Sequence, residues 1–329
     1  MPRHLSIPDA ATAVCSRSEL RARGMTEREI ARAVEHGRLR KLQRNRYVAG
    51  AVWEDLWPES RHLVELSAAA AEMRAGGGVA SHESAGALRR LPFYRHVPEA
   101  VHITLPPGTR MSSRPGLKRH HDRLPEDDID VLGGIRCTSL DRTTFDLVRT
   151  LSPEAAVAVA DAALGQVAMR EGEYDDREAE VWRERMLERC RRYRASRGVR
   201  QAEQVIRFAD GRSESPGEAV GRLQLRRLGF RRLRVQVPVR GPAGKDYRVD
   251  IEIEDVRTFF EFDGLGKYLE ESQRSGRTVE QVVLDEKRRE DWIRGTTQKR
   301  MVRAESPHIL TPAALAQRLA AFGVVPPAR

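Results

Sequence analysis

Apolar and polar residues alternate with the period of a β-strand near the C-terminus. In RVDIEIE, Val249, Ile251 and Ile253 alternate with acidic residues, and in FFEFD, Phe260 and Phe262 alternate with acidic residues in the same way. An alternation of period two predicts a strand with one apolar face and one polar face. Because only a short polar stretch separates the two segments, we expect a hairpin whose acidic side chains share the face opposite the core.

The segments around this hairpin predict a complete domain. The predicted elements are, in order, a helix SPGEAVGRLQLRRLG, strands RVQVPV, YRVDIEIE and TFFEFD, a helix VEQVVLDEKRREDWIRG, a strand KRMVRA and a helix TPAALAQRLAAFG. This order is α-β-β-β-α-β-α. A mixed sheet flanked by helices is the class that it favours.

The first 50 residues predict two short helices and a basic hairpin. Residues 16–19 and 26–29 both have the pattern of a helix capping box, and Gly24 separates the two helices. The stretch RLRKLQRNRYVAG then alternates leucine with basic residues around a turn at residues 44–45. This combination is typical of a winged helix-turn-helix.

The central part of the chain predicts a second domain and a connector. Residues 51–165 contain an alanine-rich helix, the strand VHITLP, a loop with Lys118 and Arg119, and a further helical stretch. Residues 166–212 are dense in charge and predict a solvated helical connector. The expected protein is therefore α+β or mixed α/β and multidomain, with segments 1–50, 51–165, 166–212 and 213–329.

Composition narrows the classes of partner. The 329 residues contain 58 Lys and Arg against 48 Asp and Glu, which gives a net charge of +10 and favours nucleic acid as the partner. The three cysteines are far apart and predict neither a disulfide framework nor a zinc site. No apolar run has the length of a signal peptide core or a membrane span, so we expect a cytoplasmic protein without membrane contact.

The acidic hairpin is the strongest candidate for chemistry in this basic chain. A register that places Asp250 across from Glu261 is allowed, and like charges so close need a cation between them. Glu218, in the first turn of the preceding helix, adds a third carboxylate, and oxygen ligands of this kind suit Mg²⁺ or Mn²⁺. Two structural readings stay open: arginines neutralise a solvent-facing acidic surface, and Glu218 only caps its helix.

The segments RSESPGE, RVDIEIE and EFDG, followed by a basic helix, resemble an endonuclease-like domain. That domain is related to very-short-patch-repair endonucleases of actinobacterial type, within the PD-(D/E)xK superfamily, and the resemblance covers about residues 212–305. It implies Mg²⁺-dependent cleavage of nucleic acid, with Asp250 and Glu261 as metal ligands and Glu218 in support. Asp263 stands where the superfamily has a lysine, and Lys267 or Lys287 would supply that cation.

The N-terminal part resembles the AbiEi-type antitoxin regulators of type IV toxin-antitoxin systems. The resemblance rests on the helix start at residues 18–20 and on GRLRKLQRNRYV, VASHESAGAL and TSLDRTTFDLV, which together span most of residues 14–165. It implies DNA binding by a recognition helix and a wing. The basic residues implied are Arg28, Arg32, Arg38, Arg40, Lys41, Arg44 and Arg46.

Histidines carry no site in the sequence-based interpretation. Ser81, His82 and Glu83 are adjacent in a helical stretch, where they point in different directions and form no triad. His120 and His121 lack a second ligand pair of suitable spacing, so we expect them to touch phosphate or solvent from a loop.

Two principal hypotheses follow from these patterns. The first is a DNA-binding protein with a metal-dependent endonuclease domain. The alternative is a non-cleaving regulator or antitoxin with a degenerate nuclease fold, whose operon would contain a cognate toxin. A weaker third hypothesis is a defence or repair nuclease that docks through the connector into a larger complex.

Overall fold

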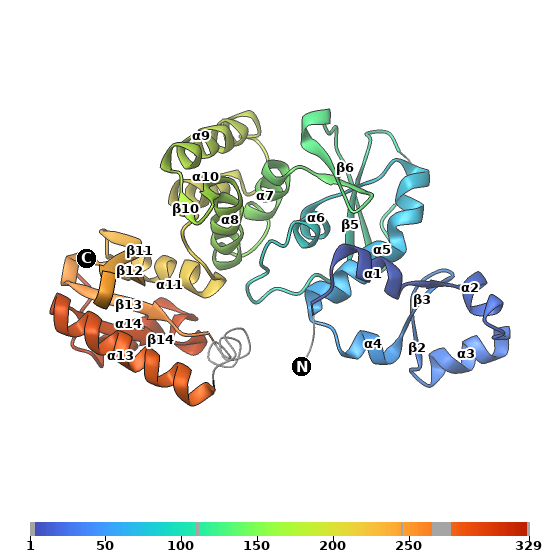
Figure 1. Cartoon of the computed structure of the whole chain (residues 1–329). Coiled ribbons are helices and arrows are strands. Elements are labelled where there is room, and N and C mark those ends of the chain that lie inside the picture. The colour runs from blue at the N-terminus through green and yellow to red at the C-terminus, as the bar shows by residue number, and fades with distance from the viewer. Residues whose placement is uncertain (1–3, 110–111, 245, 265–277, 328–329) are drawn as a thin grey trace. The chain divides into compact units, whose positions relative to one another are not determined.

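The computed structural model describes residues 4–109, 112–244, 246–264 and 278–327, which form a mixed α/β structure with several sheets (Figure 1). The chain divides into two compact units. Unit 1 comprises residues 1–151 and 188–202, and unit 2 comprises residues 152–187 and 203–329. These boundaries differ from the four segments predicted from sequence, because residues of the expected connector belong to both units. Within the described ranges, every helix is too short or too polar to cross a membrane.

Unit 1 begins with short helices and a three-stranded antiparallel sheet of order β1-β3-β2. Leu20, Ile30 and Tyr47 form the small core that joins the helices to the sheet. The elements are α1 (Ile7–Ala13), β1 (Cys15–Ser16), α2 (Arg17–Ala22), α3 (Glu27–Glu35), β2 (Leu39–Gln43), β3 (Arg46–Ala49) and α4 (Gly50–Glu54).

Both predicted capping boxes in this region are confirmed. At the start of α2, Glu19 N–H donates to Ser16 Oγ (3.1 Å) and Ser16 N–H donates to a Glu19 carboxylate oxygen (2.6 Å). Thr26 and Glu29 make the same reciprocal pair at the start of α3. The hairpin turn also lies where the sequence placed it, with Asn45 in the left-handed region at φ 61°.

The rest of unit 1 is built on a five-stranded sheet of order β6-β5-β4-β8-β7. Helices α5 and α6 pack on β5, as the ribbon in Figure 1 shows. The elements are α5 (Pro58–Gly76), β4 (Val79–Ala80), α6 (His82–Leu88), β5 (Val101–Leu105), β6 (Leu117–His121), β7 (Ile129–Leu132), β8 (Ile135–Thr138) and α7 (Leu140–Val148).

Strand β6 corrects one sequence-based prediction. The segment with Lys118, Arg119, His120 and His121 is an edge strand paired in parallel with β5, not a loop. An edge strand has little of its polar surface covered by the sheet, so it tolerates consecutive polar residues that give no alternation signal.

Unit 2 opens with helices. The first boundary between the units lies just before α8, and the other two fall within α9 and α10. In this part, Arg222 donates to both carboxylate oxygens of the buried Asp161 at 2.9 Å. The elements are α8 (Pro153–Ala168), β9 (Met169–Arg170), β10 (Glu173–Tyr174), α9 (Asp176–Arg192), α10 (Val199–Phe208) and α11 (Pro216–Arg227).

A four-stranded sheet of order β11-β12-β13-β14 completes unit 2. The first three strands are antiparallel neighbours, and β14 pairs in parallel with β13 after the crossover through α13. The observed order therefore confirms the predicted α-β-β-β-α-β-α sequence of elements. These are β11 (Leu233–Arg240), β12 (Asp246–Ile253), β13 (Thr258–Phe262), α13 (Val279–Thr297), β14 (Arg300–Ala304) and α14 (Pro312–Ala320).

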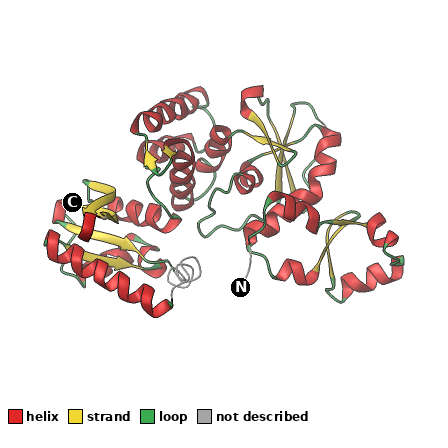
Figure 2. Ribbon diagram, viewed as in Figure 1, coloured by secondary structure: helices red, strands yellow, loops and turns green. Residues whose placement is uncertain are grey.

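Helices cover both faces of this sheet (Figure 2). On one face, α11 approaches β13 so closely that a Cβ on Gly217 would lie 2.0 Å from the Phe262 ring. On the other face, Ile293 of α13 packs with Phe259 and Met301. Since alternate residues of β13 point to opposite faces, Glu261 shares the α13 face with Phe259.

Gly217→Ala should destabilise unit 2, because the new methyl group has no room between α11 and the Phe262 ring. We expect a loss of about 1–3 kcal/mol, the usual cost of overpacking. Gly295→Ala is the matched control: Gly295 is an exposed residue of α13 with nothing within 4 Å of its added Cβ. It should stabilise the helix by up to about 1 kcal/mol. Urea denaturation of both variants checks the contrast, and similar effects would contradict the close approach.

Candidate functional site

The hairpin of β12 and β13 has the register that the sequence allowed. Ile251 lies opposite Phe260 and Ile253 lies opposite Thr258, with Arg257 at φ 49° in the turn. The ladder of paired residues ends at Ile251 and Phe260, one residue short of Asp250 and Glu261. Beyond it, the Asp250 carboxylate accepts a hydrogen bond from the Phe262 N–H (2.9 Å).

Glu261 is the most deeply buried of the predicted ligands, and two arginines hold it. Its side chain is 3% exposed, and the guanidinium of Arg289 on α13 donates to Oε1 at 2.6 Å. Arg303, its neighbour in the β13–β14 register, lies 3.4 Å from Oε2. Burial alone would lower the pKa of Arg289, but its hydrogen bond to Glu261 raises that pKa above the ordinary value. The cation opposite the buried carboxylate is therefore arginine.

The two arginines extend this pairing into a network across the face covered by α13. Glu286 on α13 forms ion pairs with both Arg289 (2.7 Å) and Arg303. Arg303 also lies 3.1 Å from Glu290 and 3.3 Å from Asp263. Charges of both signs thus alternate between the sheet and α13, and we call this set the acid–arginine network. It consists of Glu261, Asp263, Glu286, Arg289, Glu290 and Arg303.

One sequence-based alternative assumed that the acidic face of the hairpin is exposed to solvent. In the structure, acidic residues of this face are buried. Glu252 is 5% exposed, and its carboxylate contacts Lys299 and Arg234. Helix α13 and the flanking strands cover this face because their basic side chains supply the opposite charges. The same alternative also expected arginines to neutralise the carboxylates, and the ion pairs agree with that expectation.

One of the two predicted cationic replacements, Lys287 on α13, is exposed and lies one residue away from the helix face that carries Glu286 and Arg289. Lys267 lies outside the described residues. Asp263, at the position of the usual lysine, accepts from Arg303 (3.3 Å) and donates its N–H to the Ala304 carbonyl (2.9 Å).

Glu218 lies in the first turn of α11 and has local partners. Its carboxylate accepts from the Glu214 N–H (2.9 Å) and from the Gln236 amide (3.3 Å), while its own N–H donates to Ser215 Oγ. The helix start therefore keeps half of the predicted capping box, with the glutamate reaching one residue further back. Burial raises the pKa of Glu218 above its ordinary value.

The three carboxylates predicted as metal ligands do not converge. Among the described residues, Asp250, Glu261 and Glu218 belong to no group of three ligand atoms within 4.8 Å of one another; that spacing is met instead by His82, His102 and His120 in unit 1. A divalent cation at Glu261 would have to compete with the two guanidinium groups already present.

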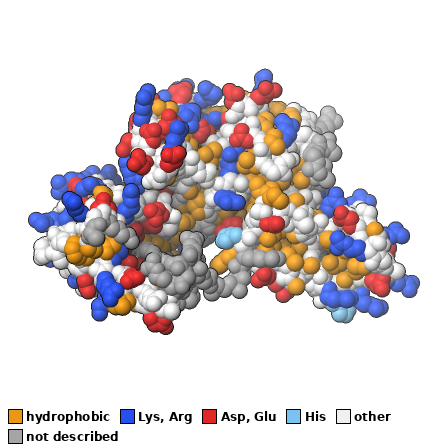
Figure 3. All heavy atoms as spheres, in the orientation of Figure 1, with side chains coloured by type: hydrophobic (Ala, Val, Ile, Leu, Met, Phe, Trp, Pro, Cys, Tyr) orange, Lys and Arg blue, Asp and Glu red, His pale blue; other side chains and the backbone are white. Residues whose placement is uncertain are grey.

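The predicted DNA-binding residues lie on α3 and on the β2–β3 hairpin. Six of them have exposed side chains. Five of these six form neither an ion pair nor a cation–π contact within the described part of the chain; they are Arg28, Arg32, Arg38, Lys41 and Arg44. Figure 3 shows basic side chains over the part of unit 1 where α3 and β2 lie, at the lower right. We call these five residues the basic surface.

The other two predicted DNA-binding residues have roles within the fold. The guanidinium of Arg40 lies 4.3 Å from the ring centroid of Trp53, which is a cation–π contact. Arg46 is half-buried and pairs with Ser16 between β3 and β1. Arg40 nevertheless remains exposed, whereas Arg46 is partly covered by the fold.

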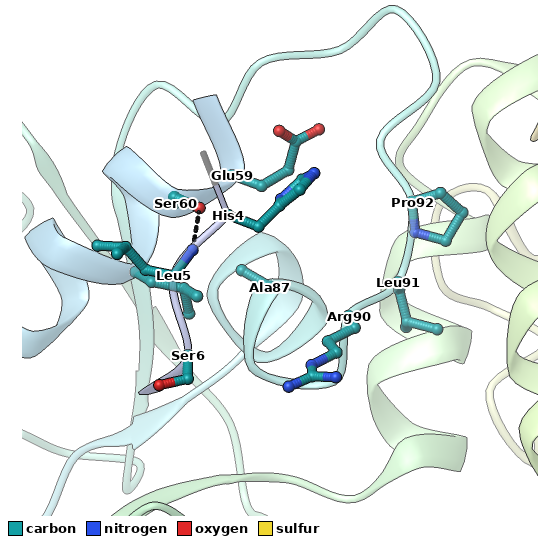
Figure 4. Close-up of a pocket in the computed structure, with 10 residues that line it drawn as sticks. His4, Leu5, Ser6, Glu59, Ser60, Ala87, Arg90, Leu91 and Pro92 are labelled. Carbon is teal, nitrogen blue, oxygen red and sulfur yellow. Dashed lines mark hydrogen bonds between the residues drawn. The ribbon is translucent and has the colours of Figure 1, made fainter. Parts of the chain in front are cut away.

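A cavity of about 520 Å³ in unit 1 contains none of the predicted site residues. It lies between the N-terminal segment and helices α5 and α6, where Leu5 N–H donates to Ser60 Oγ (2.9 Å) (Figure 4). His4, Glu59 and Arg90 are its charged or titratable lining residues.

Comparison with known proteins finds distant relatives of unknown function. The chain is 29% identical over 203 residues to the uncharacterized protein Rv2248 of Mycobacterium tuberculosis strain H37Rv, with 58% of this chain and 69% of the relative covered. The uncharacterized protein MT2308 of strain CDC 1551 matches with the same values. No family model matches the chain.

Sequence reasoning missed the partners of the acidic hairpin. Arg289 and Glu286 were interpreted as part of a solvated helix face, because alternating charges on a helix usually face water. The signal that could have located them is their spacing with Ile293, three and four residues apart along one face of α13.

Arg289→Met should destabilise unit 2 strongly, because it leaves the buried Glu261 carboxylate with one arginine in place of two. We expect a loss of about 3 kcal/mol, typical of breaking a buried ion pair from one side. Arg288→Met is the control on the same helix: Arg288 is 69% exposed and its pair with Asp285 lies at the surface. Its loss should cost less than about 1 kcal/mol. Denaturant unfolding measures both, and equal losses would contradict a special role for the acid–arginine network.

Proposed function

We propose that the protein binds double-stranded DNA through its first 50 residues and regulates rather than cleaves it. The observation that carries this proposal is the basic surface, whose five exposed cations lack ion-pair partners among the described residues. Unpaired cations on one surface attract phosphate and release its counterions on binding.

The elements beneath the basic surface support binding in the manner of a winged helix. Ile30 and Ala33 of α3 are buried, and Arg28 and Arg32 project from its exposed face. In this mode α3 would enter the major groove while the hairpin contacts the phosphate backbone. The α2–α3 pair, the β2–β3 hairpin and the third strand β1 supply the elements that such a module needs.

The acid–arginine network favours the non-cleaving alternative for unit 2. A two-carboxylate metal site needs lone pairs available to the ion. Oε1 of Glu261 accepts a hydrogen bond from Arg289, and the Arg303 guanidinium lies 3.4 Å from Oε2, which accepts no hydrogen bond from the described residues. Lys287, one of the two lysines proposed to replace the usual cation, is exposed on α13. We therefore propose that the protein is a regulator or antitoxin whose nuclease-like domain does not cleave, and that it acts together with a cognate toxin.

The second candidate function is a Mg²⁺-dependent endonuclease. The observation that favours it is the β12–β13 hairpin, which carries Asp250 and Glu261 on neighbouring strands of a mixed sheet. In this case bound DNA or metal would have to displace a guanidinium group from Glu261.

Arg32→Ala should weaken duplex DNA binding because it removes one exposed cation from α3. The slope of log affinity against log salt should fall by about 0.9 if the lost contact was to one phosphate. Fluorescence anisotropy with a duplex from the region upstream of the gene, over a range of salt, measures both quantities. Arg191→Ala is the matched control, since Arg191 is an exposed helical arginine already paired with Glu188 at 2.7 Å. Equal affinities and slopes for the two variants would contradict the proposed surface.

Wild-type protein should not nick supercoiled plasmid or single-stranded DNA with Mg²⁺ or Mn²⁺, and Asp250→Ala should behave identically. The reason is that arginines occupy Glu261 in the described arrangement. Gel assays with the full chain over both metals check this. Metal-dependent nicking that disappears in Asp250→Ala would replace the regulator by the endonuclease, while leaving the DNA-binding proposal intact.

A further inference from the structure

Three histidines from different elements meet in unit 1. His82 is the first residue of α6, His102 lies in β5 and His120 lies in β6. One ring nitrogen from each lies within 4.8 Å of the others. His82 and His102 are buried and His120 is half-buried, so the cluster sits beneath the surface with one member reaching it.

The spacing of two of these rings suits a common metal ion. His120 Nε2 lies 3.3 Å from His102 Nδ1. The rings of His82 and His120 stack with centroids 3.9 Å apart, so the His82 ring has to turn before its nitrogen can join the other two on one ion. Two nitrogen ligands at about 2.0–2.1 Å from a tetrahedral zinc ion lie about 3.3 Å from each other. The observed separation of the first pair already has that value.

The backbone holds the three rings in place. His120 lies opposite Thr104 in the parallel β5–β6 ladder, so His102 and His120 point to the same face of the sheet. The His102 N–H donates to Ser84 Oγ at 2.8 Å. His82 has φ 50°, a left-handed conformation that is unfavourable for a residue with a side chain and that concentrates at functional sites.

A carboxylate lies near the second ring nitrogen of His102. Glu83 Oε2 lies 3.8 Å from His102 Nε2, the ring nitrogen on the side away from His120, and Glu83 Oε1 lies 3.1 Å from His96 Nε2. Histidines that ligate a metal commonly have such a carboxylate at their other nitrogen, which orients the ring and increases its basicity.

We propose that His82, His102 and His120 form a binding site for one divalent transition-metal ion of the zinc class, with one coordination position left for water or a ligand. Three imidazoles and an open position constitute a ligand set that zinc uses, whereas Mg²⁺ requires oxygen ligands. The site does not depend on DNA binding or on the acidic residues of unit 2.

Co²⁺ titration of the metal-free full-length protein tests the site, because Co²⁺ substitutes for zinc and its visible absorption reports coordination. We expect one equivalent to bind with the d–d bands of a four- or five-coordinate ion, and Zn²⁺ to displace it. His102→Gln and His120→Gln should abolish this spectrum. Glu83→Gln should keep the spectrum but weaken affinity by about 10–100-fold, as expected for a residue that positions a ligand.

Two controls separate this site from other metal-binding groups. His121→Gln should bind Co²⁺ like the wild type. His121 is exposed, and as the neighbour of His120 along β6 its side chain points to the opposite face of the sheet. Asp250→Asn should also bind normally, which excludes the acidic hairpin. The proposal is overturned if the folded wild type binds no stoichiometric Co²⁺, or if His120→Gln retains both affinity and spectrum.

Ring ¹⁵N chemical shifts of the wild-type protein test the site without any substitution, so the result does not depend on whether a variant folds. Addition of Zn²⁺ should shift the ring nitrogens of three histidines at one equivalent and leave those of the exposed histidines unchanged. Unchanged shifts for all histidines would show that the cluster only packs and hydrogen-bonds within the fold, and would overturn the proposal.

Discussion

The pairing of the buried Glu261 carboxylate with Arg289 and Arg303 is the constraint on which the architecture of unit 2 depends. A carboxylate that is 3% exposed loses its hydration, and it stays ionised at tolerable cost only with opposite charges and hydrogen bonds around it. Arg303 arrives from the next strand and Arg289 from the crossover helix. The strand order and the placement of α13 must therefore be correct together for the charge to be accommodated.

This constraint explains how a basic protein accommodates an acidic hairpin. The carboxylates of β12 and β13 lie on a face that α13 covers, and that helix and β14 bring arginines to it. Arginine suits the task because its planar fork donates in several directions at once and it remains charged when buried. Arg303 uses this capacity to contact four carboxylates, Glu261, Asp263, Glu286 and Glu290.

Local patterns in the sequence predicted most of the elements, whereas the contacts between distant elements could not be predicted. Alternation predicted the strands β12 and β13, and the capping boxes at Ser16 and Thr26 predicted where α2 and α3 begin. The charged face of α13 gave the wrong impression of a solvated helix, because periodicity reports which residues share a face and not what covers it. The histidine cluster was missed for a related reason. Its members are 20 and 18 residues apart along the chain, and only the β5–β6 pairing and the start of α6 bring them together.

The two clusters differ in the cations that they can accept, and the difference follows from the charge of their side chains. Carboxylates in unit 2 require a positive charge at all times at neutral pH, so the fold itself must provide one, and a metal ion could enter only by exchange with arginine. An imidazole, unlike a carboxylate, carries no negative charge, so the fold does not have to place a cation beside the histidines of unit 1. The permanent arginine partners therefore make the acidic hairpin a structural centre. Among the described residues, the three histidines are a better candidate for a metal ion than the carboxylates of the hairpin.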